Sequence, residues 1–213
     1  MQGLEQIEEK IRQTFVAKNA ARDAALAKSR EVIRHCSLSI RASHRAEYEN
    51  AAQILETARN VADAMKQDVA PYPDLHYTGY VQDALKEVTE AHIVHALLTN
   101  QPIPDPDALG IDYAAYLNGL GEAATEMRRY ILDIIRHEQL ERSEAMLQAM
   151  DDIYAMLVTM DFPDALTGGL RRQTDIVRGV LEKTRGDLTV AWRQEKLEKR
   201  LREFQTSWVK SDN

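Results

Sequence analysis

The sequence predicts an all-α protein, and three observations support that fold class. The six prolines gather in three places: Pro71 and Pro73, then Pro102, Pro104 and Pro106, then Pro163. Between these breaks alanine, leucine, glutamate, arginine and glutamine dominate, and these residues favour helix. Valine, isoleucine and threonine rarely alternate with polar residues, so strand signals are few. The 213 residues suffice for one hydrophobic core, and we expect a single domain over residues 1–213.

About six or seven helices are expected, because the proline and glycine breaks divide the chain into a few long segments. The first helix, which we expect to be bent or broken, and the second both precede Pro71. The dipeptide Leu109-Gly110 closes the loop before the fourth helix, and Gly168-Gly169 ends the loop before the last. The expected helices cover about residues 4–43, 45–69, 78–99, 111–137, 139–159 and 171–208.

The composition favours a cytoplasmic protein that does not enter a membrane. The first ten residues lack the apolar core of a signal peptide, and no apolar run is long enough to cross a bilayer. The one cysteine, Cys36, excludes an internal disulfide, which suits a reducing compartment. We interpret Cys36 as a buried structural thiol.

Charge is distributed unevenly along the chain. Residues 18–45 hold seven lysines or arginines against two acids, whereas residues 46–167 hold seven against twenty-two. Basic residues that recur along a helix can follow a phosphate backbone, and here the candidates are Arg34, Arg41 and Arg45. The alternative is a solvated helix face whose charges pair with acids elsewhere. Residues 168–203 form a second basic segment, with ten basic residues against six acids.

Carboxylates on two expected helices indicate a divalent metal site. Asp83, Glu87 and Glu90 lie at i, i+4 and i+7, on a stripe that continues through Val94 and Leu98. Like charges at these spacings destabilise a helix, and buried charge must be paired or bound to metal. The fourth expected helix carries a second acidic stripe, made of Glu122, Glu126 and Asp133. Oxygen ligands from two helices suit Mg²⁺ or Mn²⁺.

Two other interpretations of these carboxylates stay open. A salt-bridge network with Lys86, Arg128 and Arg129 as partners would also compensate them. A di-metal carboxylate centre usually supplies Glu-x-x-His pairs, and the sequence contains none, so we rank it below the others. His92 and His95 face the apolar side of their helix and are expected to be satisfied core or interface histidines.

Two segments resemble the translin and translin-associated factor X family. Leu85-Lys-Glu-Val-Thr-Glu-Ala91 is similar to the acidic helix of factor X, the catalytic partner of translin. Tyr116-Leu-Asn-Gly-Leu-Gly-Glu-Ala-Ala-Thr-Glu-Met-Arg-Arg129 resembles the family's Tyr-Leu-x-Gly helix, which ends in Glu-Leu-x-Arg. The resemblance covers nearly the whole chain. It implies an all-α, long-helix fold whose subunits assemble into a hollow, roughly octameric shell, with single-stranded RNA cut inside by a magnesium-dependent endonuclease.

The resemblance also assigns the site residues. It implies that Glu87, Glu90, Glu122 and Glu126 hold Mg²⁺ or Mn²⁺ and form the catalytic site, although the factor X branch has an aspartate where Glu122 stands. A chain with this carboxylate set could form a homo-oligomer without a translin partner, as in an archaeal-type single-gene version. The hypothesis is therefore a metal-dependent endoribonuclease. The alternative is a non-catalytic oligomer of translin type that binds single-stranded RNA or DNA.

Overall fold

The computed structural model describes residues 3–211, and within them every regular element is helical. Six long helices carry the fold: α1 (Leu4–His44), α2 (Tyr48–Val69), α4 (Gly79–Thr99), α6 (Tyr113–Ile135), α7 (Leu140–Val158) and α9 (Leu170–Ser211). Three one-turn helices lie in the loops: α3 (Pro73–His76), α5 (Pro106–Leu109) and α8 (Asp164–Thr167). The predicted all-α class is confirmed. No helix in this range is long and apolar enough to cross a membrane.

The prediction that the first helix is bent or broken is wrong in its stronger form, because α1 is one uninterrupted helix of 41 residues. The reason is local: no proline or glycine occurs between Leu4 and His44, and alanine is frequent there. Only the second half of α1 has a buried face, which includes Val32, Cys36 and Ile40. Cys36 is buried as predicted, and burial raises the pKa of its thiol well above the usual range.

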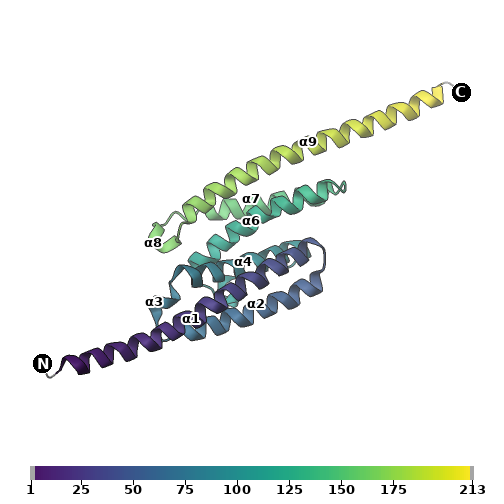
Figure 1. The fold of residues 1–213 in the computed structure, drawn as a ribbon. Coiled ribbons are helices and arrows are strands. Elements are labelled where there is room, and N and C mark those ends of the chain that lie inside the picture. The colour runs from purple at the N-terminus through teal and green to yellow at the C-terminus, as the bar shows by residue number, and fades with distance from the viewer. Residues whose placement is uncertain (1–2, 212–213) are drawn as a thin grey trace.

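The helices form successive layers, and α4 and α6 lie in the middle of them (Figure 1). The α1–α2 pair packs on α4, α4 packs on α6, and α6 is covered on its other side by α7 and α9. Both α4 and α6 contribute large fully buried side chains to the core, among them Leu85, Ile93, Met127 and Ile131. The N-terminal end of α1 and the C-terminal end of α9 extend beyond these layers in opposite directions (Figure 1).

Candidate metal centre

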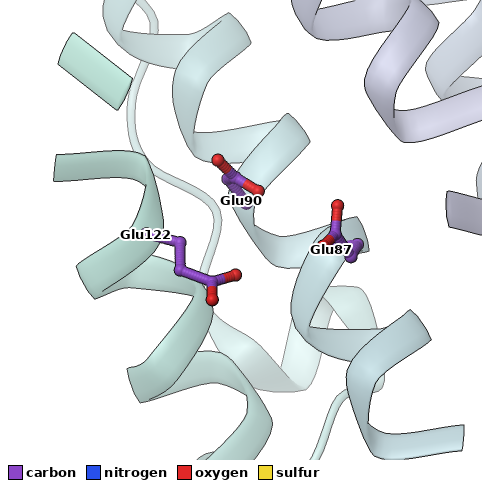
Figure 2. A group of neighbouring side chains, drawn as sticks. All are labelled: Glu87, Glu90 and Glu122. Carbon is purple, nitrogen blue, oxygen red and sulfur yellow. The ribbon is translucent and has the colours of Figure 1, made fainter. Parts of the chain in front are cut away.

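Three of the predicted carboxylates meet where α4 and α6 pack together. Glu87 and Glu90 project from α4 and Glu122 from α6, and one oxygen of each lies within 4.8 Å of the others (Figure 2). All three side chains are half-buried. The stripes read from the sequence therefore lie on facing edges of two neighbouring helices. Asp83, which the same stripe included, stays outside the group and is 66% exposed.

Gly119 explains how the two helices come close enough for these carboxylates to meet. A Cβ atom at this position would lie 2.5 Å from the carbonyl oxygen of Lys86 and 2.7 Å from Cβ of Thr89. Lys86 and Thr89 flank Glu87 and Glu90 on α4, and Glu122 follows Gly119 by less than one turn on α6. Only a glycine permits this approach, so the glycine of the Tyr-Leu-x-Gly segment sets the separation of the acidic side chains.

Replacing Gly119 with alanine is expected to lower the melting temperature, because the added methyl group must push α4 and α6 apart. Overpacking of this kind costs about 1–3 kcal/mol, which corresponds to a shift of roughly 2–4 °C per kcal/mol. Gly121→Ala is the matched control two residues along the same helix, since the atoms nearest its Cβ belong to the side chain of Gln173, which can shift, whereas Gly119 faces the backbone of Lys86. Thermal unfolding by circular dichroism compares them. Equal melting temperatures for the two variants would contradict the proposed role of Gly119.

The acidic group is incompletely compensated. Burial raises the pKa of Glu90 to about 8, and the charges of Glu87, Glu122 and Glu126 add to the effect. Burial also raises the pKa of Glu87, followed by the charge of Glu122. Neither carboxylate forms a hydrogen bond or ion pair with any residue between positions 3 and 211. Two half-buried acids without a partner are the arrangement that a bound cation would stabilise.

Glu122, unlike Glu87 and Glu90, has a direct partner, because Lys86 Nζ donates a hydrogen bond to its Oε1 at 2.7 Å. Burial lowers the pKa of Lys86, but the hydrogen bond and the charge of Glu122 outweigh that effect and raise it overall. The salt-bridge interpretation is therefore realised at Glu122 through Lys86 and, at a longer distance, at Glu126 through Arg129. Arg128, its second proposed partner, instead binds Asp187 on α9 at 2.7 Å.

The fourth predicted ligand, Glu126, is held apart from the other three. Its Oε1 lies 2.7 Å from Nε2 of His44, the last residue of α1, and 3.8 Å from a guanidinium nitrogen of Arg129. The charge of Glu126 still reaches the group, since it contributes to the raised pKa of Glu90. Its role as a metal ligand stays a prediction. Sequence reasoning missed His44, because no local pattern links residues 82 positions apart.

The predicted basic residues, two on α1 and one directly after it, have different environments. Arg34 and Arg41 are exposed and make no ion pair within the described part of the chain. Arg45 is also exposed, but its guanidinium donates two hydrogen bonds to Glu47, at 2.7 and 2.9 Å. The two histidines of α4 are satisfied, as predicted: Nδ1 of His92 lies 2.7 Å from the carbonyl oxygen of Val88, and Nδ1 of His95 lies 3.4 Å from Oγ of Ser43.

Comparison with known proteins identifies similar chains. A scan against models of protein families finds no match. Two solved structures of AfC3PO, a crystal structure and a complex with duplex RNA, are 30% identical to this chain, with TM-scores of 0.81 and 0.80. In the RNA complex the match covers 87% of this chain and 96% of the other. An uncharacterized protein of Methanocaldococcus jannaschii is 28% identical over 191 residues, which are 88% of this chain and 84% of that protein. Apo-NeC3PO, at 20% identity, shares the fold with a TM-score of 0.77, over 90% of this chain and 98% of that one.

Proposed function

This chain belongs to the translin and C3PO family, and from that premise we propose that it is a metal-dependent endoribonuclease that cuts single-stranded RNA. One observation carries the proposal. Glu87, Glu90 and Glu122 bring one oxygen each within 4.8 Å of the others, and two of these carboxylates have no partner among the described residues. A structural ion-pair network has no need to leave two half-buried acids without a direct ion pair.

The donor set fits a hard divalent ion. Carboxylate oxygens are the ligands that Mg²⁺ and Mn²⁺ prefer, and Mg²⁺ usually takes only one or two carboxylates and keeps several waters. Glu87, Glu90 and Glu122 would hold the ion, and we retain Glu126 as a fourth candidate at the edge of the site. When bound, the ion polarises a phosphoryl oxygen and lowers the pKa of a water molecule.

The side chains of the site supply the other requirements of phosphodiester hydrolysis. A carboxylate must take the proton of the attacking water as the new phosphorus–oxygen bond forms and the bond to the leaving oxygen breaks, and Glu87 is our candidate for that base. The leaving oxygen takes up a proton from solvent. The ammonium group of Lys86, bound to Glu122, places a positive charge beside the acids, where an anionic phosphate must approach.

A cleavage assay tests the proposal directly. End-labelled single-stranded RNA is incubated with the purified chain in Mg²⁺, in Mn²⁺ and in a chelator, with duplex RNA as a second substrate because AfC3PO forms a duplex RNA complex. We expect internal cuts that depend on the divalent ion. Cleavage at the same rate in the chelator would contradict the proposal.

A non-catalytic RNA- or DNA-binding oligomer is the second candidate, and one observation favours it. Lys86 and His44 already satisfy two of the four predicted carboxylates, Glu122 and Glu126, without any ion. The same assay separates the candidates. Tight binding of RNA with no cleavage at any metal concentration would support the second candidate over the first.

We further propose that the chain forms a homo-oligomer larger than a dimer, with the hollow octameric shell as the expected form. Leu97 and Leu98 pack in or against the core of one subunit and leave no apolar face of α4 exposed there. Several exposed apolar residues lie on the projecting helices: Leu4, Ile7, Ile11 and Phe15 on α1, and Val190, Leu197 and Leu201 on α9. Their spacings place each set on one stripe of its helix, and such stripes usually mark interfaces.

Light scattering at micromolar concentration measures the assembly. We expect a mass several times that of the 24.2 kDa chain. Replacing Ile7 and Ile11 with aspartate should reduce the mass, since charges cannot be buried in an apolar interface without a partner. A monomer in the unmodified protein would contradict the proposal.

A further inference from the structure

An arginine-lined hollow lies beside the acidic group, at the far end of α6 and the end of α1. Its volume is about 560 Å³. Four arginines line it: Arg45, Arg128, Arg129 and Arg136. His44 and a single acid, Asp133, line it as well. The hollow is therefore strongly basic in a chain whose formal net charge is −7. We call the space lined by these four arginines, His44 and Asp133 the arginine hollow.

Two of its arginines have guanidinium groups available for a ligand. The side chain of Arg129 is 67% exposed and its nearest carboxylate oxygen, on Glu126, is 3.8 Å away. The side chain of Arg136 is 78% exposed and lies 3.7 Å from Asp133. These separations are at the long limit of an ion pair, so both groups keep donors free. Arg128 and Arg45 are committed by short hydrogen bonds to Asp187 and Glu47.

The arginine hollow and the acidic group share one face of α6. Glu122, Arg129 and Arg136 follow one another at intervals of seven residues, which is two turns of helix. At a rise of 1.5 Å per residue, each interval spans about 10 Å. The contact between His44 and Glu126 joins the two regions.

We propose that the arginine hollow is a phosphate-binding subsite that holds the nucleic acid backbone on one side of the cleavage site, through Arg129 and Arg136. The inference rests on the proposed function, and it identifies the residues that position the substrate. A planar guanidinium matches two phosphate oxygens at once, which favours phosphate over a monodentate anion. Contacts of this kind fix the register of a strand and carry no sequence information.

Binding measurements in a chelator test the subsite separately from catalysis. The double variant R129A/R136A is compared with the unmodified full-length chain by titration of labelled single-stranded RNA at several salt concentrations. We expect the dissociation constant to rise about 10-fold or more near 0.1 M salt. The slope of log affinity against log salt should flatten by about 1.4, since each lost phosphate contact on a single strand contributes about 0.7. In the cleavage assay KM should rise while kcat stays near the parental value.

Two control variants make the result specific. R178A removes an exposed arginine with the same arrangement, an aspartate three residues before it at 3.3 Å, but on α9 and outside the arginine hollow. It should bind RNA as the parental chain does. R129K/R136K keeps both positive charges and should keep most of the salt slope. It should bind RNA less tightly than the parental chain, because lysine cannot contact two phosphate oxygens at once as a guanidinium group does.

The outcomes separate this inference from the function on which it rests. Parental affinity and slope in R129A/R136A, or an equal loss in R178A, would overturn the subsite while RNA binding and cleavage by the parental chain stand. No binding of RNA by the parental chain would overturn both. Metal-independent binding that falls as expected in R129A/R136A supports the subsite, even where no cleavage by the parental chain is detected.

Discussion

Replacing Glu90 or Glu87 with glutamine is expected to abolish most cleavage of RNA. Glutamine keeps the volume of the side chain but removes the negative charge that a metal ligand needs. Loss of a residue that only supports a ligand costs about 10–100-fold in metal affinity or activity, and loss of a ligand should cost more. Initial rates on labelled single-stranded RNA at saturating Mg²⁺ measure the effect. RNA binding in a chelator and the assembly should stay unchanged.

Asp83→Asn is the matched control for these substitutions. Asp83 is one turn before Glu87 on the same stripe of α4, but it is exposed and lies outside the group of three carboxylates. This variant should cut RNA at the parental rate. Glu122→Asp should also retain activity, because the factor X branch has an aspartate at this position. Parental rates in both Glu87→Gln and Glu90→Gln would exclude the nuclease and leave the binding-only candidate.

Without divalent ions, the chain is expected to lose thermal stability as the pH rises from about 5 to 9. The pKa of Glu90 in the folded chain is raised to about 8, first by burial and then by the neighbouring glutamates. The folded chain therefore keeps a proton that the unfolded chain releases at lower pH. This contribution is fully present below the ordinary pKa of a glutamate and is lost as the pH passes through about 8. We expect a fall in melting temperature of roughly 5 °C.

Adding Mg²⁺ and replacing Glu90 each test whether the acidic group causes this pH dependence. Mg²⁺ should raise the melting temperature most at pH 8–9, where the carboxylates are ionised and repel one another most strongly. Glu90→Gln should flatten the pH dependence and raise the stability of the metal-free chain at high pH, whereas Asp83→Asn should leave the dependence as it is. The salt-bridge interpretation requires the opposite result, with lower stability after each substitution of the site and no response to Mg²⁺.

The long helices were predictable because their boundaries are set locally. The expected helix over residues 78–99 is Gly79–Thr99 in the structure, and the expected helix over 139–159 is Leu140–Val158. Proline or glycine follows α2, α4 and α5 and precedes α9, and these residues act through backbone geometry that does not depend on distant contacts. The breaks after α1 and α6 contain neither residue, and positive φ angles at Ala46 and Glu138 make those turns. The three one-turn helices were not expected, since a run of four residues carries too little periodicity to be recognised.

The convergence of Glu87 and Glu90 with Glu122 could be anticipated from stripes on two helices and from the resemblance to the family. The partners of the outer carboxylates could not. His44 reaches Glu126 across 82 positions and Lys86 reaches Glu122 across 36, and only the packing of the helices decides such contacts. A count of charges by segment also gave no sign that Arg129 and Arg136 belong to a basic site, because both lie in the most acidic part of the sequence.

We propose above that Glu87, Glu90 and Glu122 hold a divalent ion, and diffraction can test this directly. Crystals of the protein are grown with Mn²⁺, and anomalous diffraction is measured at the manganese absorption edge. The resulting map locates the ion and does not depend on an activity assay. We predict an anomalous peak at coordinating distance from these three carboxylates, and no peak there in Glu90→Gln crystals grown in the same way. A parental map without a peak at this position, in which Lys86 still binds Glu122, would contradict the claim.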